Sequence, residues 1–337
     1  MKETALYIHI PFCDHKCIYC DFYSIITTDN ITPFLHSLKK EIDHYSVIYS
    51  ADRVYSTIYF GGGTPSLMDP YYIAEIIGYI RHKFTFLQDA EVTLETNPGT
   101  VDQIKLKDFR AAGVNRLSIG IQSFHNEELK FLTRIHDRKT AIDTVLKAKN
   151  AGFDNINIDL IFNLPGQTIQ KWSDNLEQAV SLPISHLSAY SLILERGTIL
   201  NKMVLDKKVV LQDDDYDADL YEYTLDFMEN RNFNQYEVSN FCLNGFECRH
   251  NNAYWRYGDY LSFGTSAHSF MEGRRWWNFS SLKKYIAEID SNGTAAAGSE
   301  VLNEKQQFDE YIMLALRSSG IDLLDFNKRF GMSTLQS

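Results

Sequence analysis

Three cysteines lie within eight residues near the start of the chain, where Cys13, Cys17 and Cys20 follow the apolar run Leu6–Ile10. Iron–sulfur clusters are held by cysteine thiolates, usually four of them. Three thiolates leave one iron of a [4Fe–4S] cluster without a protein ligand, so a small molecule with an amine and a carboxylate can chelate it. That arrangement is needed to reduce S-adenosylmethionine (SAM) and release a radical. The spacing therefore predicts a [4Fe–4S] cluster that works with SAM.

Two other kinds of cysteine site are less consistent with the pattern. A structural zinc site normally needs four Cys or His ligands, which His9 or His15 could complete, but spacings of three and two residues in one loop are unusual for zinc fingers. The chain has five cysteines, an odd number, and the other two are Cys242 and Cys248. Three crowded thiols and an odd total indicate metal binding rather than a disulfide framework.

Short apolar runs alternate with helical patterns over roughly the first 200 residues, and this alternation must position the cysteines. The expected strands are Leu6–Ile10, Thr57–Gly61, Glu91–Glu95, Arg116–Gln122, Asn155–Phe162 and His186–Leu194. The expected helices are Tyr71–Arg81, Gly99–Ala112, Lys139–Ala151 and Thr168–Leu182. Six strand–helix repeats predict an α/β fold with a parallel sheet and helices outside it. Because a complete TIM barrel has eight repeats, we expect an open, partial (β/α)6 barrel.

Distinctive residues follow the expected strands at their carboxyl ends, where reactive groups of parallel barrels sit. After the cysteine loop come the turn Gly61–Pro65 and the segment Glu95–Pro98; Gln122 ends the fourth strand and Asp159 lies in the fifth. These signals all belong to one rim of the barrel. Taken singly, each also has a structural explanation, such as a tight turn for the glycines or a solvated strand-end carboxylate.

The character of the sequence changes near residue 200, where we expect a domain boundary. Residues 211–230 predict an acidic helix, residues 236–270 are strand-like and rich in aromatics and glycine, and residues 281–330 read as helical. We therefore expect a partial barrel over 1–200 and a smaller α+β and helical region over 201–337.

The net charge is −11 and the isoelectric point is near 5.4, which disfavours nucleic acid as the main partner. A tRNA-modifying activity is the weaker hypothesis for the same reason. No run of about 18 apolar residues predicts a transmembrane helix. The N-terminus carries no signal-peptide pattern, so a cytoplasmic location is expected.

The cysteine spacing Cys-x3-Cys-x2-Cys resembles the signature of the radical SAM superfamily. The longer strings Tyr7–Cys13 and Cys20–Ser24 resemble the relatives of oxygen-independent coproporphyrinogen III dehydrogenase, and within them a group of heme chaperones. The resemblance runs from Leu6 to about Phe330. Members usually continue for some tens of residues beyond the end of this sequence, through a winged-helix-like region.

The resemblance implies the roles of individual residues. Cys13, Cys17 and Cys20 would bind the cluster, and Tyr7, Gly62 and Glu95 would contact SAM. The residues that match a second SAM site in the dehydrogenase are Gly63, Thr64, Gln122, Arg134 and Asp159.

The string His250-Asn251-x-x-Tyr254-Trp255 resembles the heme-binding motif of the chaperones. A neutral imidazole is a standard axial ligand of heme iron, the two aromatic rings could face a porphyrin, and Asn251 could orient the imidazole or reach a propionate. Without the resemblance, a hydrogen-bonded core histidine would be the preferred explanation for His250. Cys248 is a backup ligand or, more simply, a small buried thiol.

Three features favour the chaperone group over the dehydrogenase. No further cysteine follows Cys20 closely, no long segment precedes Cys13, and the His-Asn-x-x-Tyr-Trp string is present. The resemblance thus implies a heme chaperone that carries a [4Fe–4S] cluster, SAM and heme and delivers heme to an acceptor protein, with a membrane-associated acceptor as one option. The alternative is a coproporphyrinogen III dehydrogenase or another porphyrin-modifying radical enzyme.

Overall fold

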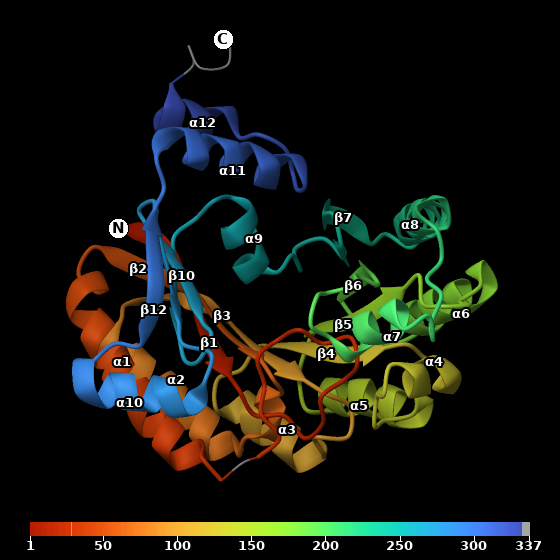
Figure 1. Ribbon diagram of the computed structural model, residues 1–337, viewed down its shortest axis with the longest axis horizontal. Coiled ribbons are helices and arrows are strands. Elements are labelled where there is room, and N and C mark those ends of the chain that lie inside the picture. The colour runs from red at the N-terminus through yellow and green to blue at the C-terminus, as the bar shows by residue number, and fades with distance from the viewer. Residues whose placement is uncertain (28, 332–337) are drawn as a thin grey trace.

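Six parallel strands form the centre of the molecule, in the order that the sequence predicts. The computed structural model describes residues 1–27 and 29–331. The strands are β1 (Lys2–Ile10), β2 (Arg53–Gly62), β3 (Phe86–Thr96), β4 (Arg116–Gln122), β5 (Asn155–Phe162) and β6 (His186–Ser191). They lie side by side in chain order, and every neighbouring pair is parallel (Figure 1). The predicted α/β class and the six-strand partial barrel are confirmed.

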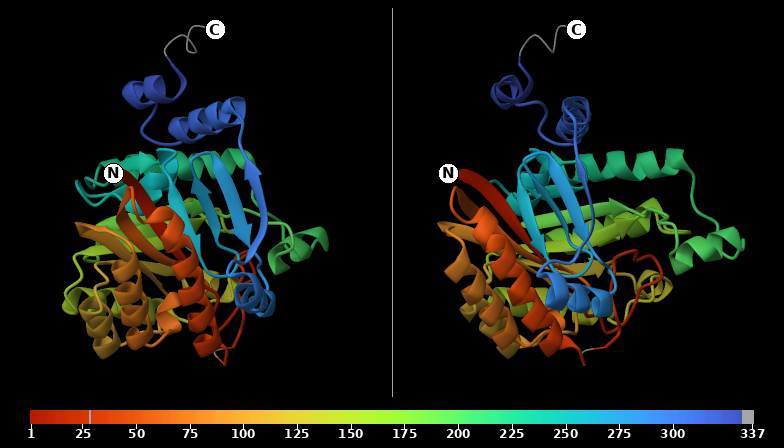
Figure 2. Two further views of the ribbon diagram at one scale, coloured as in Figure 1. Left: turned by 90° about the vertical axis from the view of Figure 1, so that its left-hand side faces the viewer. Right: turned by 60° about the vertical axis from the view of Figure 1, so that its left-hand side comes forward.

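Helices connect these strands and cover the outside of the sheet (Figure 2). They are α1 (Ile31–Tyr49), α2 (Pro70–Lys83), α3 (Gln103–Ala111), α4 (Asn126–Phe131), α5 (Arg138–Asn150) and α6 (Ile169–Val180), with a short 3-10 turn η1 (Pro65–Leu67). Helix α2 buries Ile73, Ile76, Ile77 and Ile80, which share one face at helical spacing. Asp69 caps its first turn by accepting a hydrogen bond from the backbone of Tyr71.

The region after residue 200 extends the same sheet at both edges. Its helices are α7 (Ile199–Leu205), α8 (Asp214–Glu229), α9 (Arg249–Trp255), α10 (Leu282–Asn292), α11 (Glu304–Leu316) and α12 (Leu323–Phe330). Its strands are β7 (Asn234–Glu237), β8 (Asn240–Cys242), β9 (Tyr260–Phe263), β10 (His268–Met271), β11 (Arg274–Asn278) and β12 (Ala296–Val301). The strand order is β12-β11-β10-β9-β1-β2-β3-β4-β5-β6-β8-β7, so within the described residues the sheet has twelve strands with β12 and β7 at its edges.

Helix α9 differs from the strand-like pattern expected for residues 236–270. The buried His250 and the partly buried Tyr254 are four residues apart, which places them on one helical face. The helix was not predicted because the surrounding sequence is rich in glycine and aromatic residues, a composition that favoured strands. Residues 332–337 of the expected helical end lie outside the described residues.

The buried apolar side chains form one large core, a smaller core and a cluster of three residues, Leu132, Ile161 and Leu164. The large core lies between the sheet and its covering helices. The smaller core holds the α11–α12 pair and includes Tyr257, Phe270, Leu302, Tyr311, Ala315 and Phe326. In Figure 1, α11 and α12 stand clear of the parallel strands. Within the part of the chain that the structure describes, no helix has the length and apolar character needed to cross a membrane.

Candidate functional site

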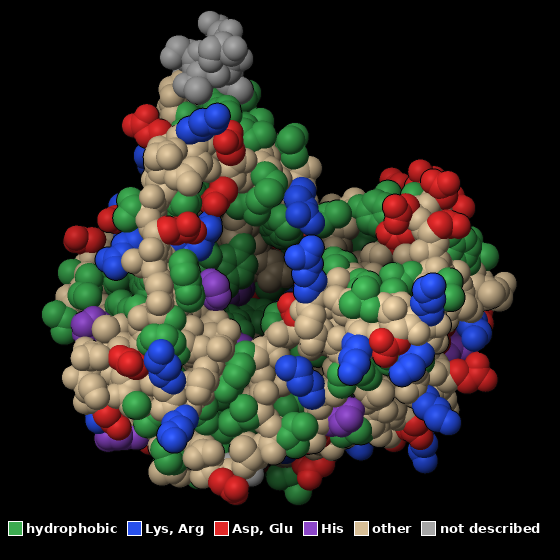
Figure 3. Space-filling model, in the orientation of Figure 1, with side chains coloured by type: hydrophobic (Ala, Val, Ile, Leu, Met, Phe, Trp, Pro, Cys, Tyr) green, Lys and Arg blue, Asp and Glu red, His purple; other side chains and the backbone are tan. Residues whose placement is uncertain are grey.

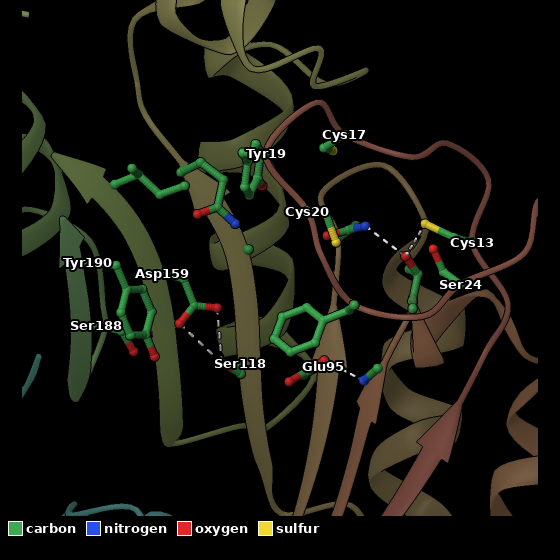
Figure 4. Close-up of a pocket in the computed structure, with 18 of the residues that line it drawn as sticks. Cys13, Cys17, Tyr19, Cys20, Ser24, Glu95, Ser118, Asp159, Ser188 and Tyr190 are labelled. Carbon is green, nitrogen blue, oxygen red and sulfur yellow. Dashed lines mark hydrogen bonds between the residues drawn. The ribbon is translucent and has the colours of Figure 1, made fainter. Parts of the chain in front are cut away.

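A cavity of about 410 Å³ opens at the carboxyl ends of the parallel strands. We call it the carboxyl-end cavity. Figure 4 shows the three cysteines on one side of it and Asp159, Ser188 and Tyr190 on the opposite side. Its volume is within the range of sites that bind small molecules.

Hydrogen bonds to the backbone of Ile18 hold the cysteine loop in place. The Ile18 amide donates to Thr133 Oγ1 at 3.2 Å, and the Leu200 amide donates to the Ile18 carbonyl at 2.9 Å. Cys13, Cys17 and Cys20 are all free thiols that are partly exposed and line the cavity. The loop therefore presents all three sulfur atoms to the same space.

Arg134 links the cysteine loop to the barrel. Its guanidinium donates to Cys17 Sγ at 3.6 Å, to Asn97 Oδ1 at 2.8 Å and to the Gly120 carbonyl at 2.6 Å. Arg134 thus joins the cysteine loop to Asn97, which follows β3, and to Gly120 on β4.

Of the two histidines that could complete a zinc site, His9 already has a hydrogen-bond partner within the fold. His9 is buried, and its Nε2 lies 2.9 Å from the Tyr23 carbonyl oxygen. A [4Fe–4S] cluster takes separate thiolates at separate irons, so three thiols spread along one loop suit it better.

The glycine turn after β2 brings its backbone against the next strand. The Gly62 amide donates to Glu95 Oε2 at 3.1 Å, and the Tyr59 hydroxyl donates to Glu95 Oε1 at 3.0 Å. Gly62 has φ +113°, and a Cβ there would lie 2.6 Å from the His9 ring, so only glycine fits. Burial, with a smaller contribution from Asp159, raises the pKa of Glu95 to about 7.

Most of the SAM-contacting residues expected from the sequence lie together in the carboxyl-end cavity. The ones that line it are Gly62, Gly63, Thr64, Glu95, Gln122, Arg134 and Asp159. Tyr7 does not line it but lies behind Tyr59, with the two rings stacked at 6.1 Å. Their contacts with SAM stay predictions.

The sequence analysis missed polar residues that fill the deeper part of the cavity. They are Arg116 and Ser118 on β4, Asn157 on β5, and Ser188 and Tyr190 on β6. These residues alternate along their strands, which is the period-2 pattern of side chains that point into a barrel. That alternation is a sequence signal that could have identified them.

Arg116 is the least expected of these residues, because its guanidinium is buried at 2% exposure. Its Nε has no hydrogen-bond partner among the described residues. Asp159, nearby, accepts hydrogen bonds from Ser118 and Asn157, and burial raises its pKa. The floor of the cavity is thus polar and charged where a typical barrel interior is apolar.

A second, larger cavity of about 890 Å³ lies at the amino ends of the strands. We call it the amino-end cavity. Residues from β1, β3, α9, α11 and α12 line it, among them Glu3, Glu91, Trp255, Tyr311 and Arg329. Figure 3 shows a hollow near the centre of one face, beside the position of α9 in Figure 1.

The residues of the His-Asn-x-x-Tyr-Trp string all lie on helix α9, and two of their side chains face different cavities. Asn251 lines the carboxyl-end cavity and Trp255 lines the amino-end cavity. His250 is buried between them at 1% exposure, with Nδ1 2.7 Å from Thr57 Oγ1 and Nε2 2.8 Å from the Tyr254 hydroxyl. Burial lowers the pKa of His250 to about 3, so the ring is neutral. An iron ligand role for His250 stays a prediction, and it would require one of these hydrogen bonds to break.

The chain is similar to known proteins over most of its length. Residues 7–179 match the family model of the radical SAM superfamily. The heme chaperone HemW of Lactococcus lactis is 35% identical over 98% of this chain and 86% of its own length. HemW of Escherichia coli is 38% identical over 81% of this chain and 72% of its own length. Among solved structures, coproporphyrinogen III oxidase (HemN) of Escherichia coli, described as a radical SAM enzyme, matches with a TM-score of 0.83 and 25% identity over 97% of this chain and 78% of that one.

Proposed function

This chain belongs to the radical SAM superfamily and, within it, to the HemW family of heme chaperones, and from this membership we propose that it binds heme and hands it to an acceptor protein. The observation that carries the proposal is the similarity to curated heme chaperones over nearly the whole chain, at 35% identity. The His-Asn-x-x-Tyr-Trp string, which lies on α9 between two cavities, supports it.

We propose that Cys13, Cys17 and Cys20 hold a [4Fe–4S] cluster. The donor set fits, because three free thiols face one cavity and Arg134 is hydrogen-bonded to Cys17. When bound, the cluster and SAM supply one-electron chemistry. Whether the chaperone consumes SAM is separate from whether it binds it.

Glu95 and the Gly62–Thr64 turn are proposed to hold SAM. The carboxylate is already fixed by Tyr59 and by the Gly62 amide, so it meets a ligand without reorganising. The close approach of the glycine backbone leaves room for a bound molecule beside it. Gln122, Arg134 and Asp159 lie farther along the same cavity and suit a second small molecule.

Heme, the proposed cargo, is expected to contact α9. The amino-end cavity has sufficient volume, and Trp255 gives it a flat aromatic wall. Its lining contains seven acidic residues and three arginines, so the two propionates need a cation. Arg256, which follows α9 as its C-cap residue, is exposed and forms no ion pair with any described residue, so we propose it as the propionate partner.

The acceptor and the compartment also belong to the proposal. All five cysteines are free in the structure, which suits a reducing cytoplasm. An acceptor in a membrane would have to be met in a transient encounter.

The second candidate function is porphyrin modification by a radical enzyme. The structural similarity to coproporphyrinogen III oxidase, with a TM-score of 0.83, is the observation that favours it. Both functions need the cysteine loop and the carboxyl-end cavity. They differ in whether a tetrapyrrole is changed or only carried.

Two assays on the cluster-loaded protein distinguish the candidates. Heme is titrated anaerobically, and the loaded protein is then mixed with apomyoglobin as a heme acceptor. Saturable binding followed by transfer supports the chaperone. Conversion of coproporphyrinogen III to protoporphyrinogen IX in the presence of SAM and a reductant would instead establish the enzyme.

A further inference from the structure

Helix α9 forms the wall between the two cavities. Asn251 faces the carboxyl-end cavity, whereas Arg249, Asn252 and Trp255 face the amino-end cavity. The helix is only seven residues long, from Arg249 to Trp255. Because isolated helices of this length are unstable in water, its position depends on contacts with the barrel.

His250 makes the most enclosed of these contacts. Both ring nitrogens are hydrogen-bonded, to Thr57 Oγ1 and to the Tyr254 hydroxyl, at 2.7 and 2.8 Å. One face of the ring is stacked on Tyr59 at 4.8 Å between centroids, and the Tyr254 ring meets it edge-on at 4.9 Å. An axial heme ligand needs a free ring nitrogen and space for a porphyrin plane beside it. The surroundings of His250 provide neither.

Glu91 holds the start of the same helix. Its Oε2 accepts a hydrogen bond from the Arg249 amide at 3.1 Å, and its Oε1 accepts one from the His250 amide at 3.3 Å. The Cys248 thiol also donates to it, at 3.6 Å. Cys248 is the N-cap residue, and its own side chain makes no capping bond. The buried carboxylate of Glu91 on β3 therefore accepts the hydrogen bonds that an N-cap side chain would otherwise accept.

We propose that Glu91 and His250 are positioning residues for heme binding: they fix α9 as the wall between the two cavities, and the heme iron takes no bond from His250. The inference rests on the proposed heme-binding function and assigns the roles within it. The motif residue that contacts heme is then Trp255, which reaches the amino-end cavity, whereas Asn251 faces the carboxyl-end cavity on the other side of the helix.

The test compares ferric heme binding by the cluster-loaded wild type and by Glu91→Gln, Thr57→Val and His250→Gln. Titration followed by absorbance gives the dissociation constant. Electron paramagnetic resonance reports the atoms bonded to the heme iron, and the oxidised [4Fe–4S] cluster is silent in that measurement. We expect each variant to weaken binding on the order of tenfold, with the iron signals of the bound heme and the cluster absorbance unchanged.

Glu177→Gln is the matched control. Glu177 lies on α6, lines neither cavity and pairs with the Arg231 side chain, and its own side chain is 53% exposed. An exposed ion pair contributes little, so less than a twofold change is expected. Wild-type heme affinity in Glu91→Gln would overturn the inference. So would iron signals that lose a nitrogen ligand in His250→Gln and keep it in Glu91→Gln.

Tyr254→Phe covers the case in which His250→Gln does not fold. This variant frees His250 Nε2 from the Tyr254 hydroxyl, its hydrogen-bond partner, with little change of shape. If His250 were the ligand, the freed nitrogen would strengthen heme binding; if it positions α9, binding weakens. No saturable heme binding by the wild type would contradict the proposed function itself and this inference with it, whereas a His250-ligated wild type would contradict only the inference.

Discussion

At the scale of single residues, the cysteine loop and the other two cysteines serve different purposes. Cys13, Cys17 and Cys20 face a cavity, whereas Cys242 and Cys248 are buried at 1% and 0% exposure. Burial raises the pKa of both buried thiols to about 12, so they stay protonated and unreactive.

This contrast makes a prediction about cluster assembly. Cys17→Ala should abolish the iron–sulfur absorbance after anaerobic reconstitution, because two protein thiolates do not hold a [4Fe–4S] cluster. Cys242→Ala is the matched control and should keep the full absorbance. A Cys17→Ala protein that retained the chromophore would contradict the assignment of the ligands.

Glu95 predicts how SAM binding depends on pH. Its pKa is raised to about 7, so the carboxyl is largely neutral at pH 6 and largely ionised at pH 8. Because the ionised form is the better acceptor for hydroxyl and amino groups, SAM affinity of the cluster-loaded protein should rise several-fold over that range. Calorimetric titration at both pH values measures it. In Glu95→Gln the affinity should be lower and nearly independent of pH; an equally steep pH dependence would rule out Glu95 as its source.

At the residue scale, the sequence identified positions with a distinctive neighbour pattern and missed those without one. The cysteine spacing and the glycine turn are visible in the sequence because each constrains several consecutive residues. Arg116 and Asn157 line the carboxyl-end cavity because each occupies an inward-facing position on its own strand. Their proximity becomes visible only once the strands are placed together. The burial of His250 depends on packing against Tyr59 and Thr57, nearly 200 residues away, and no local pattern could predict it.

At the scale of secondary-structure elements, one buried carboxylate joins the C-terminal region to the barrel. Glu41, on α1, accepts hydrogen bonds from the Gly264 amide, the Asn278 side chain and the Tyr285 hydroxyl. These donors come from the end of β9, from β11 and from α10. Burial raises the pKa of Glu41 to about 7.

Glu41 therefore contributes a pH-dependent component of stability. Its folded pKa exceeds that of the unfolded chain, about 4.5, so the contribution is full below that pH and is lost as the pH rises to about 7. From pH 5 to pH 8 the unfolding free energy of the wild type should fall relative to that of Glu41→Gln, by an amount on the order of 3 kcal/mol. The melting temperature of the wild type should fall relative to that of the variant over the same range. Asp43→Asn, on the same helix but half exposed, is the control and should track the wild type. Parallel melting profiles for wild type and Glu41→Gln would contradict the assignment.

The helices and strands of the barrel were predictable because their buried residues recur at the regular spacing of a helix or a strand. Helix α2 and the strands β4 and β5 have the expected periods and nearly the expected bounds. Helix α9 was not predicted, because its formation depends on Glu91 and on the Thr57–His250 contact rather than on its own amphipathic pattern.

At the scale of the whole molecule, the two cores predict unequal stability. The α11–α12 pair belongs to the smaller core, which Tyr311 and Phe326 help to form apart from the barrel. Fewer buried apolar contacts favour local opening at lower free energy. Hydrogen exchange should therefore be faster in α11 and α12 than in β1–β6, measured by mass spectrometry of peptides.

Heme should change this exchange pattern in a defined way. If heme occupies the amino-end cavity, exchange should slow in α9 and α11, which both line it, and stay unchanged in α2 and α5. Protection confined to the cysteine loop would place heme elsewhere and contradict the proposed location.

The shared wall has a thermodynamic consequence. A ligand bound on either side of α9 favours one position of that helix, and two ligands on opposite sides favour either the same position or different ones. If SAM shifts that position so that heme binds more weakly by some factor, heme must weaken SAM by the same factor, because the cycle of four states has to close. SAM binding would then promote heme release to the same extent that heme binding promotes SAM release. Measuring the affinity for either ligand with and without the other gives the factor for both.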